Sequence, residues 1–240
     1  MTRRRWIADE ATKDTAWLTG DRARRLATIL RARPGQEFDI VCGEQTRRGT
    51  IVEISPQRVR FELGQEVANH AVPELRLILA IYKFDRMEWA LEKCVELGVK
   101  SIQPLISART DVHLVKASAK RVERWKRLAL QASEQSRRST LPEVKAPIRF
   151  DALRDAGGHR IVLAETEGHE ALADVLLAGQ IPEDDQSTTI AIGPEGGWTG
   201  EELRWFADAG WDAASLGPTI LRAETAAIAA VAIATSELGR

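Results

Sequence analysis

From Leu75 to the end of the chain, short apolar runs alternate with segments of helical periodicity, and no other feature constrains the fold as much. Leu75–Tyr82 is an almost continuous apolar run, as in strands that are buried on both faces of a parallel sheet. Further strand-like runs lie at Ser101–Ile106, Arg160–Ala164, Thr188–Ile192 and Asp212–Leu216, and helical patterns lie at 85–97, 121–135, 200–209 and 224–238. The alternation predicts an α/β domain with a mostly parallel sheet over residues 75–240.

The first 70 residues have a different rhythm. Asp21 is placed to cap a short helix, which Pro34-Gly35 ends. Three β-prone runs follow, at Glu37–Cys42, Arg48–Ile54 and Gln57–Leu63. Closely spaced short strands favour a small β-barrel, so we expect a separate module at residues 1–70. The pattern is lost over residues 64–74, which we interpret as a linker to the second domain.

Composition and cysteine usage exclude several classes of protein. No apolar run approaches the roughly 18 residues of a membrane span. The first residues, Met-Thr-Arg-Arg-Arg-Trp, lack the apolar segment of a signal peptide. Cys42 and Cys94 are far apart and the histidines are scattered, so we expect neither a disulfide nor a metal site. The expectation is a cytoplasmic protein that does not enter a membrane.

Charge is segregated along the chain, although the formal net charge is only −1. Residues 116–149 contain ten Lys and Arg against three Asp and Glu, whereas residues 150–210 contain three against thirteen. A basic face on a nearly neutral protein attracts nucleic-acid phosphates. The alternative is an ordinary solvated helix face. The side chains that we expect to contact RNA are Arg3, Arg4, Arg5, Lys120, Arg124 and Arg127.

Two glycine-containing loops follow strands of the expected sheet. The first is Ile192-Gly-Pro-Glu-Gly-Gly-Trp-Thr199, and the second is Leu216-Gly-Pro-Thr-Ile-Leu-Arg-Ala-Glu-Thr-Ala226. Ligands of open α/β sheets bind beyond the carboxyl ends of the strands, and glycine there lets the backbone approach a ligand closely. Neither loop has the spacing of a dinucleotide fingerprint or of a P-loop, which disfavours a dinucleotide or a nucleoside triphosphate as ligand.

The expected helices carry two further signals. Asp85 with Glu88, and Thr199 with Glu202, have the spacing of capping boxes. The segment Ala226–Thr235 of the last helix is apolar on nearly every face and rich in small side chains. Such a helix is buried on both sides, either inside a single chain or against a partner subunit. We expect the second arrangement and therefore a homodimer.

Four segments of the chain together resemble the motifs of a known family. The first loop, Ile-Gly-Pro-Glu-Gly-Gly, and the second, Leu-Gly-Pro-x-Ile-Leu-Arg-x-Glu-Thr-Ala, are similar to its paired signature. Glu134-Gln135-Ser136 with Arg138 and Pro142 resembles Glu-Gln-x-x-Arg-x-x-x-Pro, and Lys83 with the helix ending Glu96-Leu97-Gly98-Val99 resembles a fourth motif. The family is that of the RsmE-type 16S ribosomal RNA (uracil-N3) methyltransferases of the SPOUT superfamily. The chain departs from the family at two positions. It has Thr219 where the family often has arginine, and Arg137 where the family often has glycine.

The resemblance implies a PUA-like β-barrel in residues 1–70 and a SPOUT methyltransferase domain with a trefoil knot in residues 75–240. It implies that the knot loops bind S-adenosylmethionine (SAM), that two subunits build each active site, and that the target is a uridine of 16S rRNA, within the small ribosomal subunit. The cofactor-binding residues carried over are Leu163, Ala164, Gly193, Glu195, Gly196, Gly197, Leu216, Gly217, Ile220, Leu221 and Arg222.

Methylation of uracil N3 requires that the imide lose its proton, which leaves negative charge on the ring oxygens. A guanidinium stabilises such charge and cannot itself act as the base, so Arg222 and Arg138 are the candidates for that role. Glu224 is a candidate for accepting the proton. Alternatively, Glu224 orients Arg222 or caps the last helix, and we rank these roles ahead of the general base.

Two other functions remain open from the sequence. A SPOUT methyltransferase of the same fold and cofactor requirement can act on transfer RNA or on a ribose 2′-hydroxyl, because the base that is modified is not readable from the motifs. A non-catalytic RNA-binding assembly factor would use only the barrel and the basic segments. The intact Gly-Pro-Glu-Gly-Gly and Leu-Arg-x-Glu-Thr elements disfavour this second alternative.

Overall fold

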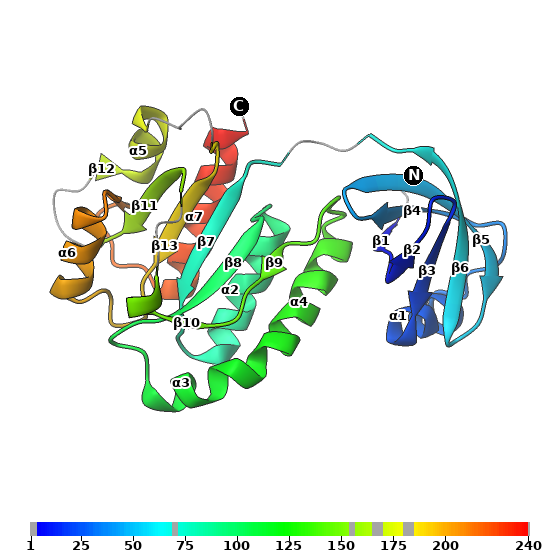
Figure 1. The fold of residues 1–240 in the computed structure, drawn as a ribbon, viewed down its shortest axis with the longest axis horizontal. Coiled ribbons are helices and arrows are strands. Elements are labelled where there is room, and N and C mark those ends of the chain that lie inside the picture. Colours follow the sequence, from blue (N-terminus) through cyan, green and yellow to red (C-terminus); the bar gives the residue numbers. More distant parts are fainter. Residues whose placement is uncertain (1–3, 69–71, 154–156, 165–169, 180–184, 240) are drawn as a thin grey trace. The chain divides into compact units, whose positions relative to one another are not determined.

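The computed structural model describes residues 4–68, 72–153, 157–164, 170–179 and 185–239. Contacts divide the chain into two compact units. Unit 1 comprises Met1–Ala71 and Ser133–Leu141, and unit 2 comprises Val72–Ala132 and Pro142–Arg240. Each unit has its own sheet (Figure 1), and each has its own hydrophobic core.

Unit 1 is built on a six-stranded sheet in the order β1-β4-β5-β6-β3-β2. Its strands are β1 (Arg5–Ile7), β2 (Glu10–Ala11), β3 (Thr15–Thr19), β4 (Glu37–Cys42), β5 (Gln45–Ile54) and β6 (Arg58–Glu66). Neighbouring strands are antiparallel except for β1 and β4. Buried and partly exposed residues alternate along β3, so only one face of the sheet packs on a core. The sheet curls around that core (Figure 1).

A short helical segment completes the core of unit 1. The α-helix α1 (Gly20–Arg24) continues as a π-helical turn, Arg25–Ile29, and contributes Ala23 and Leu26 to the core. Thr19 is its N-cap, so the expected start at Asp21 is late. At the other end of the unit, β6 runs to Glu66 and extends into the segment that was expected to be a linker. The three N-terminal strands were not expected, because runs of two to five residues are too short for a periodic pattern.

Unit 2 is built on an eight-stranded sheet in the order β10-β8-β7-β13-β11-β14-β12, with β9 paired to β8. The strands are β7 (Leu75–Ala80), β8 (Ser101–Ile106), β9 (Glu143–Val144), β10 (Ile148–Arg149), β11 (His159–Leu163), β12 (Glu170–Ala171), β13 (Thr188–Ile192) and β14 (Asp212–Ser215). Every pair is parallel, which confirms the α/β fold with a parallel sheet. β13 lies between β7 and β11, although it follows both in the sequence.

Helices cover both faces of this sheet. They are α2 (Phe84–Glu96), α3 (Val112–Ser118), α4 (Val122–Gln135), α5 (Leu172–Ala178), α6 (Gly200–Asp208) and α7 (Ala223–Leu238). Leu75, Leu77 and Leu79 of β7 share a core with α2, α5 and α7, whereas Ile78 and Ala80 face a second cluster with α6. Because both faces are covered, side chains on both faces of a central strand are buried, and all five residues of β13 are buried. None of the described helices is long and apolar enough to cross a membrane.

One of the two expected capping boxes is present. The Thr199 side chain accepts a hydrogen bond from the Glu202 amide at 3.2 Å, and the Glu202 carboxylate accepts one from the Thr199 amide at 2.8 Å, as the spacing predicted. The prediction of a capping box at Asp85 and Glu88 is wrong, because the N-cap of α2 is Lys83, which makes no side-chain capping hydrogen bond. Glu88 instead accepts hydrogen bonds from Arg121 and Arg124 at 3.2 and 2.8 Å, so a long-range ion pair displaced the local motif.

The departure at Arg137 has a conformational meaning. Arg137 has a φ of 56°, in the left-handed region that glycine adopts without strain. It follows the end of α4, where a glycine of this conformation commonly ends a helix. The backbone conformation at Arg137 thus suits the glycine that the family often has at this position. The Arg137 carbonyl oxygen accepts a hydrogen bond from Arg5 Nη1 at 2.7 Å, within unit 1.

Candidate functional site

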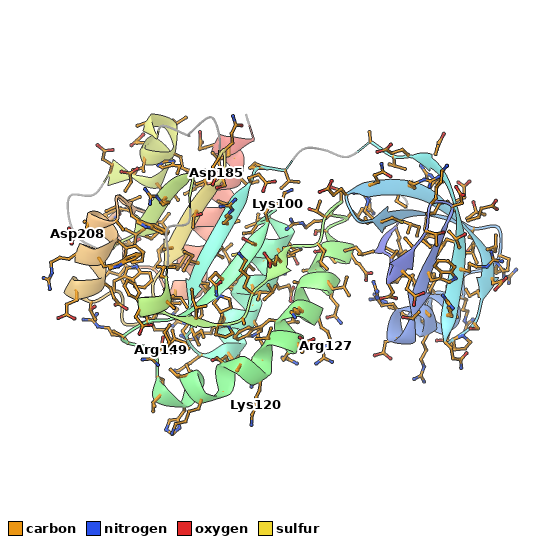
Figure 2. The ribbon with its side chains drawn as sticks, in the orientation of Figure 1. Lys100, Lys120, Arg127, Arg149, Asp185 and Asp208 are labelled. Atoms are coloured by element: carbon orange, nitrogen blue, oxygen red, sulfur yellow. The ribbon has the colours of Figure 1, made fainter. Side chains whose placement is uncertain are left out.

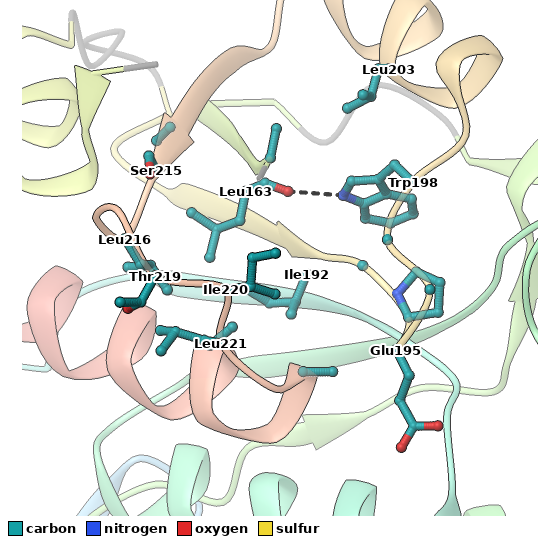
Figure 3. A pocket seen from close by; sticks show the side chains of 18 of the residues that line it. Leu163, Ile192, Glu195, Trp198, Leu203, Ser215, Leu216, Thr219, Ile220 and Leu221 are labelled. Atoms are coloured by element: carbon teal, nitrogen blue, oxygen red, sulfur yellow. Dashed lines mark hydrogen bonds between the residues drawn. The ribbon is translucent and has the colours of Figure 1, made fainter. Parts of the chain in front are cut away.

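A pocket of about 290 Å³ lies in unit 2 where three neighbouring strands end (Figure 3). Leu163 at the end of β11, Ile192 at the end of β13 and Ser215 at the end of β14 all contribute to its lining. Parallel strands end at the same edge of their sheet, so the loops that follow them meet there. The lining consists of Arg109, Leu163, Ala164, Ile192, Gly193, Pro194, Glu195, Gly196, Gly197, Trp198, Leu203, Ala214, Ser215, Leu216, Gly217, Pro218, Thr219, Ile220, Leu221, Ala223 and Ala226.

The loop of residues 193–198 forms one wall, and its glycines have specific backbone roles. Gly197 has a φ of +68° and its amide donates to the Pro194 carbonyl at 2.8 Å, which closes a tight turn. At Gly193, an added Cβ would lie 3.2 Å from Trp198 Nε1, so a side chain there would push on the indole. The capping box of Thr199 and Glu202 then fixes the start of α6. The turn and the cap together hold this loop at the strand ends.

Trp198 connects the first wall to the neighbouring strand. Its indole Nε1 donates a hydrogen bond to the Leu163 carbonyl oxygen at 3.0 Å (Figure 3). The ring is 7% exposed and packs edge-on against Phe206 and, at a tilt, against Phe150. An indole that is buried in an aromatic cluster and also satisfies a backbone carbonyl has little freedom. Trp198 therefore sets the spacing between the end of β11 and the first loop.

The loop of residues 216–222 forms the opposite wall. Gly217 has a φ of +115°, and an added Cβ would meet no atom within 4 Å. Its amide donates to Ser215 Oγ at 3.1 Å, which anchors the loop to the end of β14. Ile220 is 81% exposed, an unusual state for an isoleucine, and it contributes to the pocket lining. This wall is thus apolar and accessible to a ligand.

Two charged residues contribute to the lining of the pocket in the described part of the chain, Arg109 and Glu195. Arg109, in the loop after β8, donates a hydrogen bond from Nη1 to the carbonyl oxygen of Gly196. Glu195 accepts a hydrogen bond from Arg86 Nη1 at 2.8 Å. The first loop is therefore held by two arginines that come from two other segments.

The structure brings together all but one of the residues expected to bind the cofactor. Those that line the pocket are Leu163, Ala164, Gly193, Glu195, Gly196, Gly197, Leu216, Gly217, Ile220 and Leu221. The exception is Arg222, which is exposed and lies between the lining residues Leu221 and Ala223. Its carbonyl oxygen accepts the Ala226 amide at 2.8 Å and so begins α7. The cofactor contact of Arg222 stays a prediction.

The other two catalytic candidates have different surroundings from those expected. Glu224 is buried. Its carboxylate contacts Arg86 and not Arg222: Arg86 Nε lies 3.8 Å from Glu224 Oε1. Arg138 belongs to unit 1, where it is 7% exposed. Burial lowers the pKa of Arg138 to about 10, so the guanidinium remains protonated at neutral pH.

The neighbouring Glu134, from the same motif as Arg138, has a structural position. It accepts hydrogen bonds from Arg22 Nη1 at 2.8 Å and from the Ile7 amide at 3.4 Å, both within unit 1. Tyr82 and Cys94, which belong to unit 2, are buried, and burial raises the pKa of both groups, in Cys94 to about 12. At neutral pH both stay protonated, so neither serves as a base or nucleophile.

Some of the side chains expected to bind RNA are exposed, and others are engaged in hydrogen bonds or ion pairs within the protein. Lys120 and Arg127 are exposed along the segment formed by α3 and α4, and Figure 2 shows both pointing outward. Arg124 is exposed but also pairs with Glu88 at 2.8 Å. Arg5 is largely buried and bonded to the Arg137 carbonyl, which makes it poorly placed for phosphate. Arg4 is exposed, and Arg3 lies outside the described residues.

Sequence reasoning missed three residues that shape the site: Arg86, Arg109 and Trp198. Trp198 stands directly after the Gly-Gly of the first loop, so its position was visible although its bond to Leu163 was not. Arg86 is 109 residues away from its partner Glu195, and Arg109 is 87 residues away from Gly196, in segments without a local signal. Among the described residues, no group of three His, Cys, Asp or Glu side chains is arranged to hold a metal.

Comparison with known proteins places these features in a family context. A model of the RNA methyltransferase domain matches residues 69–235. The chain is 31% identical to the ribosomal RNA small subunit methyltransferase E of Mycobacterium tuberculosis, covering 94% of this chain and 88% of that protein. It is 30% identical to the protein of the same name from Synechocystis, covering 93% and 74%.

Solved structures agree with this match over nearly the whole chain. The crystal structure of a ribosomal RNA small subunit methyltransferase E from Neisseria gonorrhoeae, bound to SAM, superposes with a TM-score of 0.81 at 30% identity and covers 96% of both chains. A protein from Legionella pneumophila, also solved with SAM, superposes with a TM-score of 0.84 at 26% identity and covers 98% of both chains.

Proposed function

The chain belongs to the RNA methyltransferase domain family and to its ribosomal RNA small subunit methyltransferase E members, and from this membership we propose that it methylates N3 of one uridine in 16S ribosomal RNA. Its relatives are methyltransferases of the small-subunit RNA, and SAM is the cofactor of this chain. Because ribosomal RNA would be its substrate, we also place the protein in the cytoplasm.

The observation that carries the proposal is the pocket between the two loops. Its volume of about 290 Å³ is just below the roughly 300 Å³ at which the range of small-molecule sites begins. Gly217 leaves backbone uncovered on one wall, where an added side chain would narrow the space for a ligand, and an added Cβ at Gly196 on the other wall would lie 3.3 Å from Arg109 Cδ. The residues therefore fit a small ligand such as SAM, held largely by backbone and apolar side chains.

The chemistry that SAM supplies when bound is an electrophilic methyl group on a positively charged sulfonium. Leu163, Ile192, Leu216, Ile220 and Leu221 give the pocket apolar walls. Such walls favour a transition state in which positive charge is being lost over a ground state in which it is complete. The walls also keep bulk water away from the transferred group. The contribution of these residues is thus differential stabilisation and exclusion of water.

On the substrate side, we propose that Arg222 stabilises the negative charge that develops on the uracil oxygens. It is exposed immediately beside the pocket lining, so its guanidinium is accessible to an extruded base. Glu224 is two residues further on, at the first turn of α7; it is a candidate for accepting the N3 proton, ranked behind an orienting or capping role. Arg138 remains the second candidate for charge stabilisation.

The finer architecture is also part of the proposal. We assign residues 1–70 to a PUA-like RNA-binding barrel, supported by the curled six-stranded sheet, and residues 75–240 to a SPOUT domain with a trefoil knot. The insertion of β13 between two earlier strands, followed by the return of α7 onto α2, supports such a threaded topology. Lys120, Arg124 and Arg127 would hold the RNA backbone.

We further propose a homodimer. Ile228, Ala229 and Ile233 of α7 are only partly buried and Ala232 is exposed, although the helix carries few polar groups. α2, which packs in the same core as α7, exposes half of Trp89. An apolar face of this kind is typical of a subunit interface. Analytical ultracentrifugation should give twice the chain mass of 26.6 kDa, and a monomer that retains full methyltransferase activity would contradict the shared site.

The test of function combines binding with product analysis. The protein should bind SAM in calorimetry and transfer a labelled methyl group to small-subunit RNA, and nucleoside mass spectrometry should find 3-methyluridine. A 2′-O-methylated nucleoside, or methylation of transfer RNA alone, would identify one of the alternative substrates. Absence of SAM binding, with RNA binding retained, would favour the non-catalytic assembly factor instead.

A further inference from the structure

Arg86 contacts both sides of the pocket without lining the pocket itself. It lies in the first turn of α2, and its Nη1 donates to Glu195 Oε1 at 2.8 Å. Its Nε lies 3.8 Å from Glu224 Oε1. Glu195 belongs to the first loop, and Glu224 to the turn of α7 that directly follows the second loop. One guanidinium therefore joins the two sides of the site from outside the pocket.

The two carboxylates differ in what they need from a partner. Glu195 has a side chain that is 36% exposed and, as Figure 3 shows, extends away from the pocket. Glu224 has a side chain that is only 9% exposed, and its Oε2 has no hydrogen-bond partner among the described residues. A buried carboxylate with an unpartnered oxygen is costly unless a cation lies near it. Arg86 is the cation that the structure places there.

α2 is a firm base for such a contact. Met87, Ala90 and Leu91 on the same helix are fully buried in the main core of unit 2. The Arg86 side chain is 34% exposed, so its ion pairs contribute little to the stability of the fold. The contact instead fixes the relative positions of the two carboxylates, because the planar guanidinium of Arg86 faces both at once through two of its nitrogens.

We propose that Arg86 is a positioning residue that fixes the distance between the two cofactor loops, through Glu195 on one side and Glu224 on the other. This inference rests on the proposed function, because it assumes that the pocket binds SAM. Without Arg86, the loops must be ordered by the ligand, and the free energy of that ordering is subtracted from the binding free energy. The side chain of Glu224 is then no longer held in place either.

The test compares Arg86→Met with Arg76→Met. Arg76 is a matched control, since it forms an ion pair with Asp185 at 3.6 Å, both side chains are similarly exposed, and it lies near the start of β7, away from the pocket. Arg86→Met should raise the Kd for SAM roughly 5- to 20-fold. Arg76→Met should leave it unchanged, and the two variants should have similar Tm values.

Three results would overturn the proposal. The first is an unchanged Kd for SAM in Arg86→Met when the wild-type protein binds SAM normally. The second is a raised KM for RNA alone with a shallower salt dependence, which would make Arg86 a phosphate contact. The third is a decrease of Tm far beyond that of Arg76→Met that explains the weaker binding. A wild-type protein that fails to bind SAM would instead contradict the proposed function.

Two further variants test whether Arg86 affects SAM binding through its contacts with Glu195 and Glu224. In Arg86→Met combined with Glu195→Gln, the Kd should be no higher than in the weaker-binding single variant, because Glu195→Gln breaks a contact that Arg86→Met has already removed. Fully additive losses would contradict action through Glu195. Arg86→Lys should recover SAM affinity to within about threefold but leave kcat reduced, because one ammonium cannot hold both carboxylates. Complete recovery of Kd and kcat by lysine would show that charge alone suffices and would overturn the two-sided contact.

Discussion

The sheets of the two units differ in how many of their faces are covered. In unit 1, β3 alternates between buried and partly exposed residues, and exposed ion pairs such as Arg58–Glu10 and Arg60–Glu53 join its strands. In unit 2, every residue of β13 is buried, because helices cover both faces. A sheet covered on both sides can present functional groups only at its edges and ends. The pocket of unit 2 accordingly lies at the strand ends, whereas unit 1 keeps a polar sheet surface.

The charges follow the same division. In unit 1, several arginines are engaged by carboxylates or carbonyls of the unit itself. In unit 2, the pocket walls carry few charges, and Arg86 and Arg109 hold the first loop from other segments. A one-sided sheet is thus suited to contact a large polar partner, and the loop pocket to enclose a small cofactor.

The largest expected effect tests whether the units fold independently. Phe61 is fully buried in the core of unit 1, so Phe61→Ala should lower the free energy of unfolding of that unit by about 3–5 kcal/mol. The affinity of unit 2 for SAM should change less than about twofold, since no residue of the pocket belongs to unit 1. Calorimetric unfolding and SAM titration measure both. A parallel loss of SAM affinity would show that the two units form one cooperative structure.

The next prediction compares two glycines with the same backbone constraint. Gly217 in the pocket wall and Gly35 in unit 1 have φ values of +115° and +86°, and neither has an atom within 4 Å of an added Cβ. Valine at either position strains the backbone. Gly217→Val should weaken SAM binding more than about 100-fold, and Gly35→Val should not affect it. Equal affinity of the two variants in titration calorimetry would place the cofactor elsewhere.

The third prediction concerns catalysis at the edge of the pocket. Arg222→Ala should retain most SAM affinity, because the side chain does not line the pocket. It should lose about 2–4 kcal/mol of transition-state stabilisation, roughly 30- to 1000-fold in rate. Arg222→Lys should recover only part of the rate. Single-turnover methylation measures these losses, and a normal rate in Arg222→Ala would leave Arg138, in unit 1, as the leading candidate.

The same assay separates the roles of Glu224. If Glu224 accepts the N3 proton, Glu224→Gln should cause a large loss of rate that rising pH relieves, because the imide then deprotonates without a base. If it only holds the second loop through Arg86, the loss should be smaller and nearly independent of pH.

A smaller effect is expected for RNA. Replacing Lys120, Arg124 and Arg127 with glutamine should make the salt dependence of RNA binding shallower by about 0.7–0.9 for each phosphate that is no longer neutralised. Arg204→Gln is a suitable control, because Arg204 is exposed but lies in the acidic part of the chain. An unchanged slope in the triple variant would show that these charges form only a solvated helix face.

The smallest effect is expected near the end of α4. Arg137→Gly should raise the stability of unit 1 by about 0.5–1 kcal/mol, because glycine adopts the φ of 56° without strain. The bond from Arg5 is made to the backbone carbonyl and should survive. Chemical denaturation of the variant checks this gain. A loss of stability would mean that the arginine side chain contributes more than the strain costs.

Some features of the protein followed from local patterns in its sequence. The runs at Ser101–Ile106 and Thr188–Ile192 predicted the bounds of β8 and β13 without error. All residues of β13 are buried because helices cover both faces of the sheet. The capping box at Thr199 was equally visible, and the two glycine loops indicated where the pocket would form. These signals depend only on residues within a few positions of each other.

The remaining features depend on which elements become neighbours. The order of strands places β13 between β7 and β11, and only this order brings Trp198 to the Leu163 carbonyl and Arg86 to Glu195. It also gave Glu88 two arginine partners in place of a cap and assigned Glu224 to Arg86 and not to Arg222. Periodicity reports which face of an element is buried, but it carries no information about the partner element. The tertiary structure alone therefore decided which charged groups lie beside the site.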